Sequence, residues 1–202
     1  MLIFDFDGTI ADSLSALISC FNNNATYYGY KTVTNIESLR NKEAREIMRE
    51  LELPSLQLPF VVRTVRNEMR SLIHTLKPFP EIVETITELY KKGVCLGIIS
   101  SNSKENVQLF LQNNNMDFFK YIHGESSIFG KNKVIKSFLR SNSIKASDVI
   151  YIGDETRDIE AAKYNNIKSA AVTWGFNNSQ KLQAQNPHYI INSPKDLFNL
   201  VS

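Results

Sequence analysis

The sequence has few cysteines and no long apolar run, and each shortage excludes a class of protein. Its two cysteines in 202 residues, Cys20 and Cys95, cannot form a disulfide framework. Both lie in apolar runs, which predicts buried, reduced thiols in a reducing compartment. The longest apolar run, residues 93–99, is far shorter than the ~18 residues of a membrane span. We therefore expect neither a disulfide-rich secreted protein nor an integral membrane protein.

An excess of one charge is also missing. The chain has 23 Lys+Arg against 21 Asp+Glu, a formal net charge of +2, which is too small to indicate binding to nucleic acid or to an anionic membrane. The opening MLIFDFD lacks the basic start and long apolar region of a secretory signal. The hydrophobic fraction of 43% is ordinary for a chain with a globular core. We expect a cytoplasmic protein, a monomer or small homo-oligomer, that binds neither nucleic acid nor membrane.

Short apolar runs alternate with segments of helical periodicity along most of the chain. The runs are residues 2–6, 94–99, 149–152 and 169–174, with weaker ones at 121–122 and 189–191. Continuous apolar runs are typical of strands that are covered on both faces. Gly93 is placed to end the helix that follows Pro80, and Ser103 is a candidate N-cap of the next helix. The pattern predicts an α/β fold with a doubly wound parallel sheet.

Residues 14–78 break this alternation. Only helical patterns are found there, at 14–28, 44–53 and about 57–76, and no strand is predicted. These 65 residues contain nine basic and six acidic residues, a net charge of +3, whereas the remainder carries −1. A connection of this length with helices of its own is better explained as an inserted domain than as a crossover. We predict a helical domain at 14–78 and an α/β core formed by 1–13 and 79–202.

Polar residues with chemical potential follow several of the predicted strands. In an open α/β sheet, ligands bind beyond the carboxyl ends of the strands, near the point where the strand order reverses. The sequences found there are Asp5-Phe6-Asp7-Gly8-Thr9, Ser100-Ser101-Asn102 and Gly153-Asp154-Glu155-Thr156-Arg157-Asp158, and Lys131 and Lys133 begin the helix before the last of these strands. Four acids, a hydroxyl group and a lysine are therefore expected at one edge of one sheet.

The four acids suit a hard metal ion. Asp5 and Asp7 are two residues apart at a strand end, so both can face one site while Phe6 turns into the core. Two carboxylates this close repel each other unless a cation lies between them. With Asp154 and Asp158 they make an all-oxygen ligand set, which favours Mg²⁺ over zinc.

The other residues suit a phosphate. Gly8 allows a close approach of the backbone to a ligand, and Thr9 and neighbouring amides can donate to an anion. Ser101 supplies a hydroxyl donor and Lys131 a positive charge. A metal, a lysine and oriented donors around one carboxylate describe a phosphoryl-transfer site in which that carboxylate can be the nucleophile.

These motifs resemble those of the haloacid dehalogenase superfamily, in the phosphatase branch that carries a helical (type C1) cap after the first motif. The four matching segments in order are DFDGTIADS, IISSN, the GKNK region and GDETRD. The tail, AAVTWGF followed by NPHYIINSPKDL, resembles the phosphoglycolate phosphatase-like subgroup. The resemblance covers nearly the whole chain, and it implies a Rossmann-like core with strand order 5-4-1-2-3 beneath the cap.

The resemblance also implies a role for each matching acid. Asp5 would be the nucleophile, and Asp7 would protonate the leaving alcohol and then activate water. Mg²⁺ would be held by Asp5, the backbone carbonyl of Asp7 and Asp154, with Asp158 binding directly or through water. Dehalogenation is disfavoured, because it does not use the acid that Asp7 supplies.

The resemblance implies a phosphate site as well. Ser101 would bind a phosphoryl oxygen with Asn102 beside it, and Gly8 and Thr9 would contribute donors. Lys131 would neutralise charge between nucleophile and phosphate, with Lys133 as the alternative lysine. Trp174 and Phe176 are interpreted as packing residues at a strand end.

We therefore predict a Mg²⁺-dependent phosphomonoesterase acting on a small phosphorylated metabolite, phosphoglycolate-like or a sugar phosphate. A sugar-phosphate mutase is the alternative, because the motif residues do not exclude it. A non-enzymatic phospho-acceptor or binding module is disfavoured by the helical insert and by the second acid at Asp7. In the insert, Arg40, Lys42 and Arg45 either recognise an acidic substrate tail or form a solvated helix face.

Overall fold

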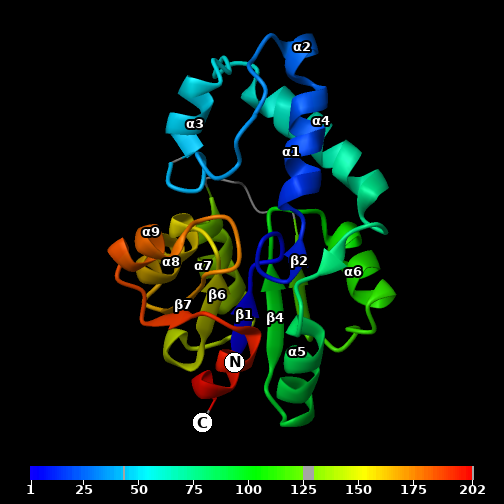
Figure 1. Cartoon of the computed structure of the whole chain (residues 1–202). Coiled ribbons are helices and arrows are strands. Elements are labelled where there is room, and N and C mark those ends of the chain that lie inside the picture. The colour runs from blue at the N-terminus through cyan, green and yellow to red at the C-terminus, as the bar shows by residue number, and fades with distance from the viewer. Residues whose placement is uncertain (43, 125–129, 202) are drawn as a thin grey trace.

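The computed structural model describes residues 1–42, 44–124 and 130–201. Its elements in chain order are β1 (Leu2–Phe4), β2 (Ala11–Asp12), α1 (Leu14–Asn23), α2 (Ala25–Tyr28), α3 (Ala44–Glu50), α4 (Leu58–Leu72), β3 (Lys77–Pro78), α5 (Ile82–Lys91), β4 (Leu96–Ile99), α6 (Lys104–Asn113), β5 (Tyr121–His123), α7 (Lys131–Ser141), η1 (Ala146–Asp148), β6 (Ile150–Gly153), α8 (Thr156–Tyr164), β7 (Lys168–Val172), α9 (Ser179–Ala184), β8 (Tyr189–Ile191) and η2 (Pro194–Leu200), η denoting a 3-10 helix. Helices α1–α4, which we call the helical insertion, lie beyond one end of the sheet, and both termini lie toward the other end (Figure 1).

Six parallel strands form the sheet, in the order β5-β4-β1-β6-β7-β8. β1 is central, and its Leu2 is in register with Leu96 of β4 on one side and Ile150 of β6 on the other. From β7 to β5 the order is the predicted 5-4-1-2-3, and β8 adds a sixth strand beside β7. The predicted α/β class with a doubly wound parallel sheet is confirmed.

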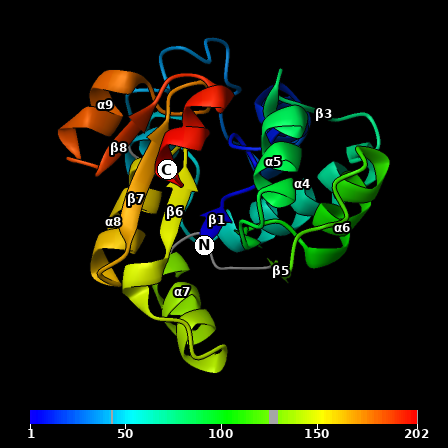
Figure 2. The ribbon, with the colours of Figure 1, turned by 90° about the horizontal axis from the view of Figure 1, so that it is seen from below.

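Alternate residues of β1 face opposite layers of helices, because successive side chains of a strand point to opposite faces. Leu2 and Phe4 pack in the apolar cluster that contains side chains of α5 and α6. Ile3 packs in the cluster that contains side chains of α7 and α8. Figure 2 shows α5 and α6 on one side of the sheet and α7 and α8 on the other. The continuous apolar run at the N-terminus therefore reflects a strand buried on both faces.

Two local signals in the sequence are confirmed. Gly93 has a φ of +81° just after α5, the left-handed conformation that glycine adopts without a steric penalty. The Ser103 hydroxyl caps α6 by accepting a hydrogen bond of 3.2 Å from the backbone amide of Asn106.

The helical insertion is joined to the core by two short strands that the sequence analysis did not predict. β2 and β3 pair antiparallel, with Ala11 opposite Pro78 and Asp12 opposite Lys77. Strands of two residues show no periodicity, so only the fold reveals them. Their pairing brings the two ends of the insertion together at one place on the core.

Within the insertion, the predicted helix at residues 14–28 is divided at Asn24. The side-chain amide of Asn24 donates to the backbone carbonyl of Cys20 at 2.8 Å and to Glu68 Oε1 of α4 at 2.8 Å. Asparagine side chains compete in this way with the regular hydrogen bonds of a helix. α4 packs on α1 and buries Val61, Val65 and Met69 at the four-residue spacing of one helix face.

Both cysteines are free thiols, and the predicted burial is confirmed for Cys20 but not for Cys95. Cys20 is buried in the insertion, whereas Cys95, just before β4, is only half-buried. Among the described residues, no helix combines the length and the apolar character that crossing a membrane requires.

Candidate active site

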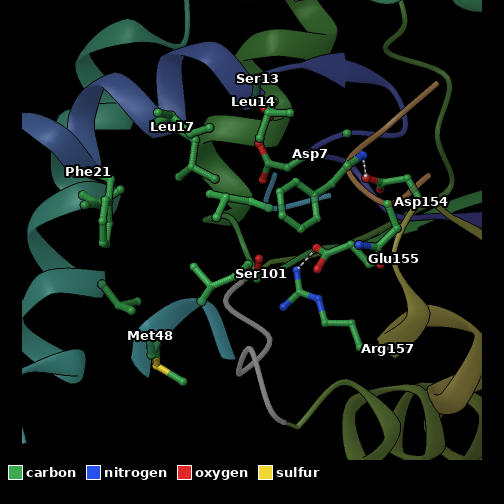
Figure 3. Close-up of a pocket in the computed structure, with 18 of the residues that line it drawn as sticks. Asp7, Ser13, Leu14, Leu17, Phe21, Met48, Ser101, Asp154, Glu155 and Arg157 are labelled. Atoms are coloured by element: carbon green, nitrogen blue, oxygen red, sulfur yellow. Dashed lines mark hydrogen bonds and ion pairs between the residues drawn. The ribbon is translucent and has the colours of Figure 1, made fainter. Parts of the chain in front are cut away.

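The predicted site residues meet at the carboxyl ends of the central strands, below the helical insertion. Asp5 and Asp7 follow β1, Ser101 and Asn102 follow β4, and Asp154 follows β6. Figure 3 shows Asp7, Ser101 and Asp154 around one cavity, facing side chains from the insertion. Parallel strands bring their carboxyl ends to one edge, which is why residues so distant in sequence lie together.

Lys131 connects two of the acids. Its ammonium group donates to Asp5 Oδ2 at 2.6 Å and to Asp158 Oδ1 at 2.5 Å, and all three side chains are buried. Burial opposes the charged form of Lys131, but the Asp158 and Asp5 carboxylates outweigh it and raise the lysine's pKa well above its ordinary value. Lys133 is exposed. Of the two candidate lysines, therefore, only Lys131 reaches the acids.

Three carboxylates are clustered as a metal site requires. Asp5, Asp154 and Asp158 each place an oxygen within 4.8 Å of the others, and all three are at most 3% exposed. The carboxylate of Asp7 is not part of this cluster; its predicted metal contact is through the backbone carbonyl. A buried all-oxygen set of this kind fits a hard divalent cation such as Mg²⁺.

The electrostatics of the cluster also fit a cation. Burial raises the pKa of Asp5 to about 6; Lys131 lowers this pKa, whereas Asp158 raises it. Burial likewise holds the pKa of Asp154 well above its ordinary value, and Glu155, Asp158 and Asp5 add to the rise. Burial is thus the main cause of both raised pKa values, and a divalent cation bound here would favour the ionised carboxylates.

Asp154 is held in place by two hydrogen bonds. Thr9 Oγ1 donates to its Oδ1 at 2.8 Å, and the backbone amide of Phe176 donates to its Oδ2 at 2.7 Å. Gly8 lies so close that a Cβ there would be 2.2 Å from Asp154 Oδ2. The predicted phosphate contact of Thr9 stays a prediction, and in this structure its hydroxyl orients the carboxylate of Asp154.

Asp7 is held by a residue of the loop that follows β4. The Asn102 side-chain amide donates to Asp7 Oδ2 at 3.1 Å. Burial raises the pKa of Asp7, and hydrogen bonds from Ser13 and Asn102 partly offset the rise. A raised pKa suits a group that must donate a proton near neutral pH. Asn102, predicted to lie beside the phosphate, is thus bonded to the candidate acid.

The two serines after β4 have different surroundings. Ser100 is fully buried, and its hydroxyl accepts a hydrogen bond of 2.9 Å from the backbone amide of Asn102. Ser101 lines the cavity (Figure 3). This placement agrees with the choice of Ser101 for the phosphate contact.

The cavity has a volume of about 830 Å³ and lies between the core and the insertion. Its base is polar, whereas the insertion contributes an apolar wall that includes Leu14, Leu17, Phe21 and Met48 (Figure 3). Of the three basic residues predicted to recognise a substrate, Lys42 and Arg45 line the cavity. Arg40 is bonded to backbone carbonyls of the core instead.

Two features of the site were missed in the sequence. Arg157 and Glu155, inside the fourth motif, form an ion pair at the cavity wall (Figure 3). The segment 175–177 after β7 contacts Asp154 and Arg40. An Arg two residues from an acid is a signal that the sequence offered, but the contacts of segment 175–177 depend on the tertiary fold.

Comparison with known proteins agrees with this geometry. The profile of the haloacid dehalogenase-like hydrolases matches residues 2–172. The chain belongs to this family. This haloacid dehalogenase-like hydrolase is 33% identical over 204 residues to a phosphoglycolate phosphatase from Synechococcus elongatus, an alignment that covers 100% of the chain and 96% of the relative. It is therefore a hydrolase of the phosphoglycolate phosphatase-like group.

Solved structures share the fold of this haloacid dehalogenase-like hydrolase. A protein from Clostridium acetobutylicum, described as a predicted phosphatase, has a TM-score of 0.85 at 24% identity, covering 99% of this chain and 96% of that one. A haloacid dehalogenase-like family hydrolase from Streptococcus pneumoniae has a TM-score of 0.78 at 24% identity, covering 100% and 97%. The shared fold thus extends over both the sheet and the helical insertion of this chain.

Proposed function

We propose that this hydrolase is a Mg²⁺-dependent phosphomonoesterase that acts on a small phosphorylated metabolite through an aspartyl-phosphate. One observation carries the proposal: Asp5, a buried carboxylate bonded to Lys131, lies in a three-carboxylate cluster, with a second acid two residues away at the cavity. The phosphatase relatives support it. A nucleophile, a counter-charge, a cation site and a proton donor are the groups that phosphate ester hydrolysis uses.

In the first step, a carboxylate oxygen of Asp5 attacks phosphorus and the bond from phosphorus to the ester oxygen breaks. Asp7 gives its proton to that oxygen, so the alcohol leaves neutral. In the second step, Asp7 takes a proton from water, which attacks the phosphorus of the aspartyl-phosphate and releases inorganic phosphate. Both carboxylates are then regenerated in their starting states.

The remaining groups bind charge. Lys131 and the Ser101 hydroxyl would contact phosphoryl oxygens, and Gly8 allows the backbone to approach them. Asp5, the backbone carbonyl of Asp7 and Asp154 would hold Mg²⁺, with Asp158 binding directly or through water. The cation would supply electrostatic stabilisation of the charge that develops on the transferred phosphoryl group.

We propose that residues 14–78 form a cap domain that opens and closes over the cavity. The paired strands β2 and β3, at both ends of the insertion, are suited to be its hinge. Lys42 and Arg45, at the cavity, are the candidates for contacts with an acidic substrate. Phosphoglycolate, named in the Synechococcus relative, and sugar phosphates both fall in the proposed substrate class.

Hydrolysis of p-nitrophenyl phosphate tests the proposal. We expect Mg²⁺-dependent hydrolysis that D5N abolishes, that excess chelator stops and that added Mg²⁺ restores. D117N removes an exposed acid outside the site and is the matched control, with wild-type rates expected. Full activity in D5N or in excess chelator would overturn the mechanism. Isomer formation from a sugar phosphate without phosphate release would favour the mutase.

A further inference from the structure

Arg40 joins the helical insertion to the loop that follows β7 in the core. Its guanidinium group donates from Nε to the carbonyl oxygen of Phe176 at 2.9 Å and from Nη2 to that of Gly175 at 2.6 Å. The side-chain amide of Asn177 donates in turn to the backbone carbonyl of Arg40 at 2.9 Å. Three hydrogen bonds therefore fix one segment of the insertion to three consecutive residues of the core.

The peptide group between Gly175 and Phe176 contacts Arg40 at one end and Asp154 at the other. Its C=O accepts from Arg40, while its N–H donates to Asp154 Oδ2 at 2.7 Å. This peptide is planar and trans, so the C=O and N–H cannot reorient separately. Hydrogen bonds in such a chain also polarise one another. A shift of the guanidinium group is thus transmitted to the carboxylate through one rigid unit.

The loop has little freedom to absorb such a shift. A Cβ on Gly175 would lie 2.2 Å from Asp154 Cβ and 2.3 Å from the carbonyl oxygen of Gly8. Asn177 is bonded on the core side as well, where its Oδ1 accepts from the backbone amide of Thr156 at 2.9 Å. The loop is therefore packed directly against Asp154.

We propose that Arg40 is a positioning residue: docked on the Gly175–Phe176 peptide, it holds Asp154 in the orientation that binds Mg²⁺, so that docking of the insertion and cation binding favour each other. The inference rests on the proposed metal role of Asp154. Such coupling is reciprocal. If docking of the insertion strengthens Mg²⁺ binding by some factor, bound Mg²⁺ strengthens the docking by the same factor.

Titration calorimetry of Mg²⁺ into the metal-free, full-length protein tests the coupling. We expect R40A to weaken Mg²⁺ binding roughly tenfold, within the usual range of coupling between two sites. Loss of the positive charge alone would act in the opposite direction, because it removes repulsion from the cation. The sign of the change therefore separates positioning from simple electrostatics.

Two further variants complete the design. R63A removes an exposed arginine of α4 in the same insertion and should keep wild-type Mg²⁺ affinity. R40K keeps the charge but lacks the planar fork that reaches both carbonyls, so it should also weaken binding. If R40A does not fold, R40K carries the test.

Hydrogen exchange gives a second readout. In the wild type, Mg²⁺ should increase protection of the backbone amides of residues 36–42 and 176–177, and in R40A this dependence should be lost. The D154N variant distinguishes failure of the proposed metal role of Asp154 from failure of the proposed coupling. If D154N binds Mg²⁺ like the wild type, the metal role of Asp154 is wrong, and the coupling with it. If D154N loses binding while R40A and R40K keep wild-type affinity, the coupling is wrong and the proposed function stands.

Discussion

At the scale of single residues, Gly8 leaves room for one of the acids of the proposed cation site, Asp154. Gly8 has a φ of +78°, and any Cβ at this position would collide with the carboxylate of Asp154. Gly29, in the insertion, has a φ of +71° with no atom near its missing Cβ. The two glycines share a left-handed backbone conformation but differ in their surroundings. Substitution of Gly29 is therefore a matched control for substitution of Gly8.

We predict that G8A is far more damaging than G29A. In both variants, a residue with a Cβ in the left-handed conformation lowers the free energy of unfolding by about 1 kcal/mol. Only G8A must also displace Asp154, which should cost at least ~2 kcal/mol more in the free energy of unfolding and should remove Mg²⁺ binding. Chemical denaturation and Mg²⁺ titration of both variants measure this. Equal losses of stability in G8A and G29A, with Mg²⁺ binding retained, would refute the steric argument.

The sequence predicted the site residues that come directly after a strand or at the start of a helix. Asp5, Asp154 and Lys131 were predicted to share one edge of the sheet, and the structure brings their side chains together. The hydrogen-bond partners of Thr9 and Asn102 were not predicted. A short polar side chain can bond to any of several neighbours, and the distances that select one of them are set only by the fold. The same reason explains why the Gly175–Phe176 peptide was missed.

At the scale of elements, the buried strands of the main sheet could be predicted from the sequence, whereas the two-residue strands β2 and β3 could not. β4, β6 and β7 lie within two residues of their apolar runs, because a parallel strand buried on both faces must be continuously apolar. β2 and β3 have only two residues each and depend on the fold to bring them together. The break at Asn24 depends on Glu68, a partner 44 residues away.

The helix α7 shows how an element selects between two candidates. Lys131 and Lys133 are two positions apart, which rotates the side chains by roughly 200° around a helix axis. Only one of them can therefore face the acids, and α7, which begins at Lys131, turns that residue into the site and leaves Lys133 exposed. The sequence contained both lysines but not the orientation of the helix.

At the scale of the whole molecule, charge is divided between two parts. The sequence from 14 to 78 carries +3 and the remainder −1, and the buried carboxylates lie in the second part. The near-neutral net charge of the chain is therefore the sum of a basic insertion and a slightly acidic core that contains the buried carboxylates. The basic residues of the insertion would attract the anionic substrates that we propose.

Stability should depend on pH and Mg²⁺ together. The pKa of Asp5 is raised from 3.8 to about 6, and that of Asp154 is raised as well. A carboxyl group with a higher pKa in the folded state favours folding when protonated, so the metal-free protein loses this contribution as pH rises from about 4 to about 6. Mg²⁺ binds the ionised carboxylates and opposes that loss.

We therefore predict that Mg²⁺ raises Tm more at about pH 7.5 than at about pH 5, where protons compete for the same oxygens. Scanning calorimetry in chelator and in excess Mg²⁺ measures both shifts, with NaCl of equal ionic strength as the control. An equal or larger Mg²⁺ effect at the lower pH would argue against the three-carboxylate cluster as the cation site.

The central claim is that Asp5 carries the phosphoryl group, and trapping that intermediate tests it most directly. In D7N the p-nitrophenolate group can still leave, because it needs no proton, but the water that should hydrolyse the intermediate is no longer activated. Acid-quenched D7N, incubated with p-nitrophenyl phosphate and Mg²⁺ and analysed by peptide mass spectrometry, should carry phosphate on Asp5, and the D5N/D7N double variant should carry none. Phosphate on another residue, or a stoichiometric burst of p-nitrophenolate from D7N without any phosphorylated peptide, would contradict the account.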